Sequence, residues 1–157
     1  LGLHAYDNFN NHAAEQKATQ DAASLNGRDL FFALFNQGIN RVALQDYSGA
    51  AASFDAAFAN YELVSQEQRP WRMMWYQTAP YFAYFYTGRY VDVVNLATQT
   101  LEASSEPILE ESFYWRALAK EALGDTSGAI ADLKEAVKLN PNFATGIYQL
   151  ERLQGGG

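Results

Sequence analysis

The sequence offers few side chains that could carry out catalysis or bind a metal ion. It contains no cysteine and two histidines, His4 and His12. A zinc site needs about four ligands that converge in space, so we expect no metal site. Glu110 and Glu111 are adjacent and would point to different faces of a helix, whereas a general acid and a general base must reach one substrate position. No phosphate-binding loop, metalloprotease motif or nucleophile elbow occurs. We therefore predict that the chain is not an enzyme and uses no cofactor.

The charge balance argues against nucleic acid as a partner. Lysine and arginine number 11 against 18 aspartate and glutamate residues, a net charge of -7, and binding to phosphates requires clustered cations. An acidic run surrounds one predicted helix start, where the helix dipole favours carboxylates. We interpret the run as a solvated face rather than a cation site. Its members are Glu102, Glu106, Glu110 and Glu111.

Length and composition indicate a folded domain. The chain has 157 residues, of which 48% are hydrophobic and 18% charged, too apolar for disorder. Its apolar runs are far shorter than the roughly 20 residues of a membrane helix, so we expect no membrane insertion. A start at Leu1 and a tail from Gly155 to Gly157 suggest a piece of a longer protein.

Two tracts of the sequence share one pattern of small and large apolar residues. In each, a small residue is followed 12 positions later by alanine, then after 4 by a large residue and after 3 by alanine. Small residues let two helices approach closely, and the large residue fills the space beside the crossing. The tracts are Gly38, Ala50, Phe54, Ala57 and Ala117, Ala129, Leu133, Ala136.

The residues between these positions predict a tight turn and then a second helix. Ser48 and Ser127 are suitable N-caps, Gly49 and Gly128 are expected to serve packing or the turn, and Pro141 ends the later helix. At this point the chain resembles the tetratricopeptide repeat family. The resemblance implies an all-α superhelix of three helix-turn-helix repeats, with an N-terminal helix and a C-terminal capping helix.

A weaker third copy lies between the two tracts. Gly88 matches the turn, and Tyr81 and Val93 stand where the pattern prefers small residues, so we expect the helices of this copy to sit further apart. Pro80 is predicted to lie inside the first helix of the pair and to kink or open it. We expect helices near 5–23, 29–44, 48–62, 69–86, 90–102, 107–123, 127–139 and 143–153.

The same pattern predicts the domain organisation. The last helix carries Phe143, Ile147, Leu150 and Leu153 on one face, as expected of the cap that a solenoid needs at its end. The expected parts are an N-terminal extension (1–28), three repeats (29–64, 65–104 and 105–142), a capping helix (143–154) and a glycine tail (155–157).

The family resemblance also implies where a ligand would bind. In tetratricopeptide superhelices the first helix of each pair lines a concave groove. Family members that grip terminal carboxylates use lysine, arginine and asparagine there, but these positions are mostly apolar or aromatic here. We therefore predict a protein-binding groove without a carboxylate clamp. Its residues are Phe32, Phe35, Asn36, Ile39, Trp75, Thr78, Phe82, Phe85, Tyr114 and Leu118.

Two interpretations of these rings stay open. An aromatic stripe at helical spacing can be core, but the tyrosines and tryptophans in 69–86 exceed what one buried stripe uses, and such residues anchor interfaces. An exposed apolar groove would need a cover. The N-terminal helix could supply it with Ala14, Ala18 and Ala22, or a partner peptide or another domain of the parent chain could do so.

Two functions follow from these interpretations. The first is a non-catalytic module, or scaffold, that binds a protein or peptide segment in the aromatic groove; self-association through the aromatic helix is a further possibility. The alternative is an accessory domain that positions substrates in a larger bacterial protein. For that alternative, the run from His4 to Asp7 before the repeats looks like the helical region that follows papain-like, leader-peptidase-type cysteine peptidase domains. That resemblance implies the bacterial cell envelope or exterior.

Overall fold

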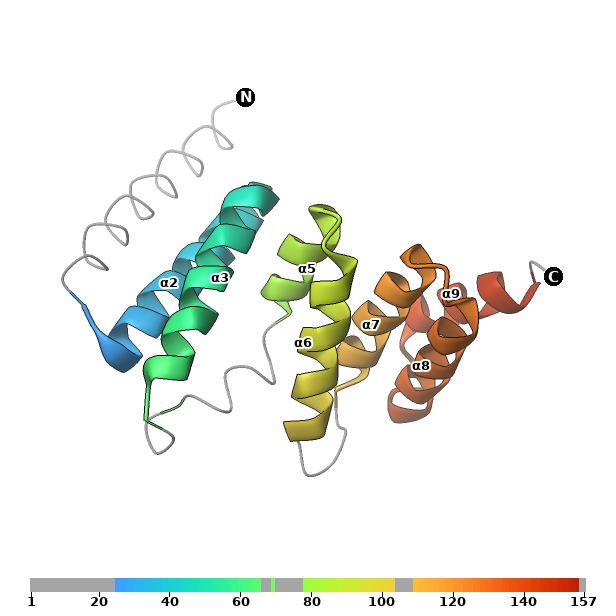
Figure 1. Ribbon diagram of the computed structural model, residues 1–157. Coiled ribbons are helices and arrows are strands. Elements are labelled where there is room, and N and C mark those ends of the chain that lie inside the picture. The colour runs from blue at the N-terminus through green and yellow to red at the C-terminus, as the bar shows by residue number, and fades with distance from the viewer. Residues whose placement is uncertain (1–24, 66–68, 70–77, 104–108, 156–157) are drawn as a thin grey trace. The chain divides into compact units, whose positions relative to one another are not determined.

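The computed structural model describes residues 25–65, 69, 78–103 and 109–155. In these residues every regular element is an α-helix and no strand occurs (Figure 1). The helices are α2 (Gly27–Ala43), α3 (Tyr47–Leu63), α5 (Ala79–Tyr86), α6 (Tyr90–Ala103), α7 (Glu110–Ala122), α8 (Thr126–Leu139) and α9 (Ala144–Gly155). Neighbouring helices pack as they do in helical repeats, and the predicted all-α class is confirmed.

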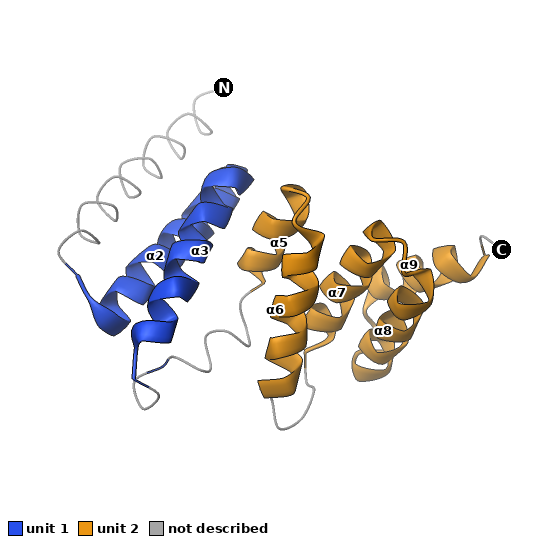
Figure 2. Ribbon diagram, viewed as in Figure 1, with its two compact units in different colours: residues 1–71 blue, residues 72–157 orange. Residues whose placement is uncertain are grey.

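The chain forms two compact units, which Figure 2 distinguishes by colour. Unit 1, Leu1–Trp71, contains α2 and α3. Unit 2, Arg72–Gly157, contains α5 to α9. The predicted helix over 5–23, with its alanine stripe, lies outside the described residues. The predicted division into repeats stays a prediction.

In unit 1, an aromatic core holds α2 against α3. The side chains of Phe31, Phe35 and Phe54 are at most 1% exposed, and the Phe35 and Phe54 rings lie 5.0 Å apart, edge to face. Gly38 is the small residue at the crossing, since a Cβ atom there would come within 2.6 Å of the Phe54 ring. The close approach predicted from the spacing of Gly38 and Phe54 is therefore confirmed.

Two polar side-chain contacts inside unit 1 join α2 and α3. The Ser53 hydroxyl donates a hydrogen bond of 3.3 Å to the buried side chain of Gln37. The Asn60 amide donates to the carbonyl of Gly27 over 2.6 Å. Arg69 donates to the carbonyl of Val64, just beyond the C-terminus of α3. Buried polar groups need such partners, so the bonds of Ser53 and Asn60 fix how α3 lies along α2.

The second helices of two pairs begin with the same cap, and it is not the one we predicted. Asp46 and Asp125 are the N-caps, and their carboxylates accept hydrogen bonds of 2.9 Å from the backbone N–H groups of Gly49 and Gly128. The prediction of serine caps is wrong, because both helices start two residues before the aligned glycine. Ser127 instead donates to the Asp125 carboxylate. Aspartate and serine cap about equally well, so the start of the helix decides the role.

In unit 2, α9 closes the core formed by α7 and α8. Ala117, Ala129 and Leu133 are at most 1% exposed and form one buried cluster. Leu150 and Leu153 of α9 pack against this cluster. The apolar face predicted for the last helix is therefore confirmed in these two leucines.

The first helix of the middle pair differs from the prediction. We expected one helix over 69–86 with Pro80 in its interior, but α5 begins at Ala79 and Pro80 lies in its first turn. Proline is tolerated there because the first N–H groups of a helix have no partner within the helix. Tyr81 and Val93 are buried, at 2% and 0% exposed, and the Tyr81 hydroxyl shares a hydrogen bond of 3.0 Å with the Ser112 hydroxyl. Residues 70–77 lie outside the described part of the chain.

The remaining predicted helices match α2, α3, α6, α8 and α9 to within two residues at each end. The helix predicted at 107–123 is described from Glu110 to Ala122. Within the described residues, no helix combines the length and apolar character needed to cross a membrane.

Candidate functional site

The best-defined candidate site lies in unit 2, where faces of α5 and α7 lie in register. Residues four apart share a helix face. Thr78, the N-cap of α5, is therefore followed on one face by Phe82 and Tyr86. On α7, Glu111 and Trp115 share a face in the same way. The Thr78 side chain interacts with the Glu111 carboxylate by hydrogen bonding. One turn further on, the Phe82 and Trp115 rings lie 4.5 Å apart.

Trp115 is the centre of an aromatic cluster. Its side chain is 6% exposed, and three further rings lie within 6.4 Å of it: Phe85 at 5.6 Å, Tyr86 at 6.4 Å and Tyr114 at 5.8 Å. Phe82, Phe85 and Tyr114 are partly buried, whereas Tyr86 is 55% exposed. We call Phe82, Phe85, Tyr86 and Tyr114, together with Trp115 beneath them, the aromatic face.

The C-terminal helix borders this face through Tyr114. The Tyr114 ring packs at 5.3 Å on Phe143, just before α9, and its hydroxyl interacts with the Gln149 side chain. Burial, followed by the nearby Tyr86, raises the pKa of Tyr114 above its ordinary value. The phenol is therefore neutral at physiological pH and acts as a hydrogen-bonding group at the edge of an apolar surface.

Glu111, an exposed residue, gives the aromatic face a carboxyl group with a raised pKa. Burial is the main cause that raises the pKa of Glu111, and the neighbouring carboxylate of Glu110 adds to it, while Thr78 opposes both. Glu110 itself accepts a hydrogen bond of 2.9 Å from the Asn140 amide. The arrangement thus places an acidic group one helical turn before Trp115, the centre of the aromatic face.

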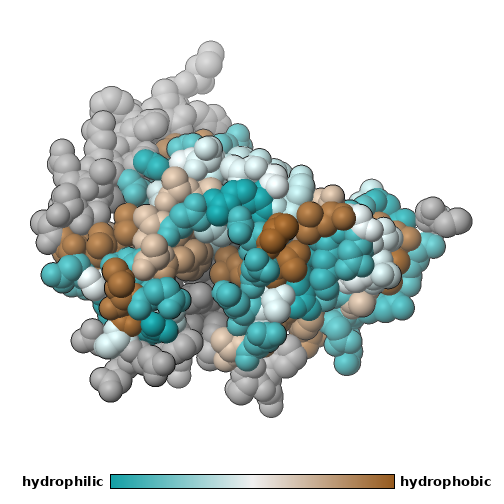
Figure 3. Space-filling view, viewed as in Figure 1, coloured by the Kyte–Doolittle hydropathy of each residue, from teal (hydrophilic) through white to brown (hydrophobic). Residues whose placement is uncertain are grey.

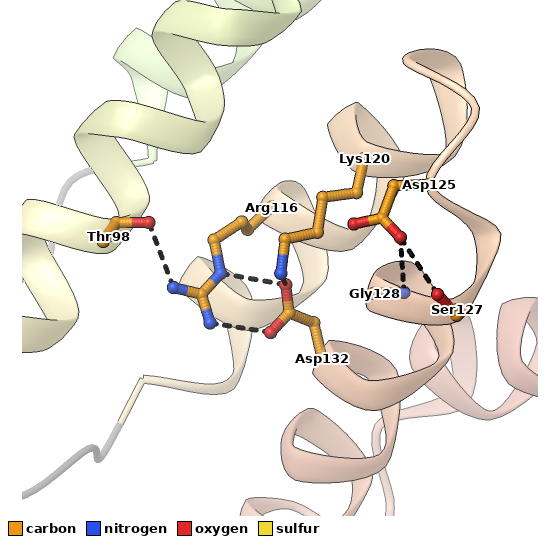
Figure 4. A network of polar contacts seen from close by, with 7 residues as sticks. All are labelled: Thr98, Arg116, Lys120, Asp125, Ser127, Gly128 and Asp132. Carbon is orange, nitrogen blue, oxygen red and sulfur yellow. Dashed lines mark hydrogen bonds and ion pairs between the residues drawn. The ribbon is translucent and has the colours of Figure 1, made fainter.

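The opposite side of α7 carries the positive charges of that helix (Figure 4). Arg116 holds the Asp132 carboxylate of α8 with two bonds of 2.8 and 2.7 Å, and Lys120 pairs with the same carboxylate at 2.8 Å. Arg116 also donates to the Thr98 hydroxyl of α6 over 3.1 Å. Asp132 is 5% exposed. This buried network ties α6, α7 and α8 together and is structural.

Figure 3 shows the hydropathy of one side of the molecule, the side on which α6 and α8 lie in front of α5 and α9. There hydrophilic residues predominate over α8, and hydrophobic ones form smaller groups. Two large apolar side chains of these helices are exposed, Val91 at 57% and Leu139 at 38%. The aromatic face belongs to α5 and α7 instead.

Most of the groove residues predicted in unit 2 lie at or near the aromatic face. Thr78, Phe82, Phe85, Tyr114 and Leu118 are all partly buried, and all but Leu118 take part in the contacts above. Leu118 follows Tyr114 by one turn on α7. Trp75 lies outside the described residues.

In unit 1 the predicted groove residues divide between core and surface. Phe35 is 1% exposed and packs on Phe54 and Phe58, as the core interpretation of these rings expects. Phe32 is partly buried, with the Arg28 guanidinium 5.3 Å from its ring centre. Asn36 is exposed and Ile39 is partly buried, so these two and Phe32 keep some accessible surface.

Sequence reasoning missed two features of unit 2. Trp115 is not among the predicted groove residues, although it follows Glu111 by four residues and therefore shares its helix face. The Arg116–Asp132 pair was also missed. Asp132 interrupts the apolar stripe of Ala129 and Leu133, and a charged residue within a buried stripe needs an oppositely charged partner. That signal could have been found.

The described residues contain no group of three or more histidine, cysteine or acidic side chains able to hold a metal ion. His4 and His12 lie outside this part of the chain.

Part of the chain matches a known family. Residues 111–142, which include α8 and nearly all of α7, match the family model described as Tetratricopeptide repeat. No curated protein matches the chain. The match coincides with the tract recognised from Ala117, Ala129, Leu133 and Ala136, so the resemblance predicted from the sequence is confirmed there. Residues 111–142 therefore resemble a tetratricopeptide repeat, and repeats of that family are typical of protein-protein interaction modules.

Proposed function

We propose that this chain, which carries a tetratricopeptide repeat at 111–142, is a non-catalytic module that binds a polypeptide segment on the aromatic face of unit 2. The observation that carries the proposal is the row of partly exposed rings on α5 and α7 around one buried tryptophan. Interfaces are enriched in tyrosine, tryptophan and phenylalanine at their centres. The groove residues predicted in the other unit, Phe32, Asn36 and Ile39, are secondary candidates.

The composition of the face supports a peptide rather than a small polar ligand. Rings such as Phe82 and Tyr86 offer apolar area at a low cost in side-chain entropy, because each has only two side-chain torsions. Tyr114 and Gln149 add hydrogen-bonding groups at the border of the face. A segment with spaced apolar side chains could use both kinds of contact, as helices and extended peptides do in other grooves.

The test is panning of a phage-displayed library of random peptides on the whole chain. We expect enrichment of peptides that lose binding when Phe82 is changed to alanine. Val91→Ala is the matched control, since Val91 is an exposed apolar residue of α6. Phe82 packs on Trp115, so Phe82→Leu, which keeps apolar volume but removes the ring, is tested together with circular dichroism melting.

Two results would overturn the proposal. One is the absence of any enriched peptide. The other is enrichment that Phe82→Leu leaves unchanged while the variant stays folded.

The accessory role in a larger bacterial protein is the second candidate. It rests on the resemblance seen between His4 and Asp7, which lie outside the described residues. On this proposal a neighbouring domain, rather than a separate partner, occupies the aromatic face. An upstream sequence without a cysteine and histidine pair in a folded domain would remove its support.

A further inference from the structure

Helix α7 separates its charges between two sides. Arg116 and Lys120 are both engaged by Asp132 on the side that faces α8. Glu111 and Glu121 lie away from that side of α7. Glu121 is paired with Arg152 of α9 at 2.6 Å. Within the described part of the chain, no lysine or arginine forms an ion pair with Glu111. The aromatic face therefore has one carboxylate whose charge the described residues do not balance.

The aromatic rings of unit 2 also differ in whether a positively charged side chain lies over them. Guanidinium groups lie over Tyr84 at 4.4 Å and over Phe113 at 5.4 Å. No such contact is made with Phe82 or Tyr114 by a described residue. Both rings border Trp115, and the face of an aromatic ring attracts a cation. A carboxylate and adjacent rings together form a surface complementary to one positive charge.

We propose that the aromatic face binds a polypeptide segment in which an arginine or lysine side chain follows or precedes apolar residues, with Glu111 pairing with the cation. The apolar neighbours of the cation would lie on the rings of Phe82 and Tyr86. The inference rests on the proposed function, because it specifies the chemistry of the segment that the same face takes.

The environment of Glu111 favours such a partner over water alone. Partial burial raises the pKa of the Glu111 carboxyl, and the neighbouring Glu110 carboxylate raises it further. A positive charge beside Glu111 opposes both effects, because it favours the ionised form of that carboxylate. An arginine can do this with two parallel hydrogen bonds and can stack on a ring at the same time.

The position of Glu111 also sets where the cation would lie on the face. Thr78 and Glu111 form the first level of contacts between α5 and α7, and Phe82 and Trp115 form the next. The cation would therefore bind at the N-terminal end of α7, and the apolar residues would extend from there towards Tyr86.

The test uses the peptides enriched by panning on the whole chain. We expect lysine or arginine beside apolar residues in the enriched sequences. A synthetic copy of the strongest peptide is then measured by fluorescence anisotropy, together with a version in which the basic residue is glutamine. We expect Glu111→Gln to weaken the basic peptide about fivefold, as one partly exposed ion pair allows, and to leave the glutamine peptide unaffected.

Glu135→Gln is the matched control. Glu135 is an exposed carboxylate on α8 that pairs with Lys138 at 3.2 Å, and its change should not alter binding of either peptide. The Glu111 effect should also shrink as salt is raised, because exposed charge pairs are screened.

The outcomes separate this inference from the proposed function. Enriched peptides that are apolar without a basic residue, and that bind through Phe82, would overturn the inference and leave the function standing. The inference also fails if Glu111→Gln weakens both synthetic peptides equally. No enrichment at all would remove both.

Discussion

The helix pair of unit 1 and the pair formed by α7 and α8 have the same spacing but hold their helices together differently. In both pairs a residue before the small position of the first helix contacts a residue 16 positions later on the second. In unit 1 these are Gln37 and Ser53, joined by a neutral hydrogen bond. In unit 2 the equivalent residues are Arg116 and Asp132, joined by an ion pair that Lys120 also enters.

The two pairs also differ in the sizes of the residues where their helices cross. Unit 1 combines Gly38 with the large ring of Phe54, whereas unit 2 combines Ala117 with the smaller Leu133. A gain in volume on one helix accompanies a loss on the other, as close packing requires. Spacing therefore fixes where two helices meet, while the chemistry at the meeting point is free to vary.

The largest expected effect is the loss of the buried carboxylate. Asp132→Ala leaves Arg116 and Lys120 without their shared partner, and breaking a buried pair in this way costs about 3 kcal/mol. Ser53→Ala, the equivalent change in unit 1, removes a neutral hydrogen bond and should cost about 1 kcal/mol. Urea unfolding followed by circular dichroism measures both. Equal losses in the two variants would contradict the distinction between the pairs.

A smaller effect is expected where the volumes are exchanged. Gly38→Ala brings a methyl group against the Phe54 ring, and the overpacking, about 1–3 kcal/mol, should outweigh the gain of about 1 kcal/mol in helix propensity. In a Phe54→Leu background the same change should stabilise, because the space is then like that beside Ala117. Thermal melts of the single and double variants measure this coupling.

The control for that cycle is Ala117→Gly in unit 2, which should destabilise whatever residue is paired with it. If Gly38→Ala has the same effect with phenylalanine and with leucine at position 54, the volumes are not coupled.

The smallest effect concerns the shared caps and pH. Hydrogen bonds from the Gly128 backbone and from Ser127 lower the pKa of Asp125 below its ordinary value of 3.8. A group whose pKa is depressed on folding adds stability above its unfolded pKa and loses it as pH falls through its folded pKa. Asp125→Asn keeps a capping side chain but does not titrate. The difference in melting temperature between wild type and this variant should therefore shrink as pH falls below about 4. A difference that stays constant over this range would contradict the role of the carboxylate.

Much of the helical framework follows from sequence alone, for reasons visible in particular residues. The recurring small residues, such as Ala50 and Ala129, mark where helices approach, and the apolar face that includes Leu150 and Leu153 requires a surface to cover. The caps could not be chosen this way, because Asp46 and Ser48 are both good caps and stand two residues apart. The sequence also did not show that Pro80 lies in the first turn of a helix, because its aromatic neighbours predict a helix but not the residue at which it begins.

The candidate site depended more strongly on tertiary structure. Phe35 and Tyr114 occupy equivalent positions in the two aligned tracts, and their helices have the same periodicity. Yet Phe35 is buried against Phe54 and Phe58, whereas Tyr114 lies partly exposed between Trp115 and Phe143.

The sequence by itself determined which residues share a helix face, because that depends only on the 3.6-residue turn of the helix. It also determined that the helices pair, since small residues recur where two of them must cross. Only the tertiary structure decided which of those faces are covered and which stay open. Exposure depends on the size and position of side chains contributed by other helices, and the periodicity of one helix carries no information about its neighbours.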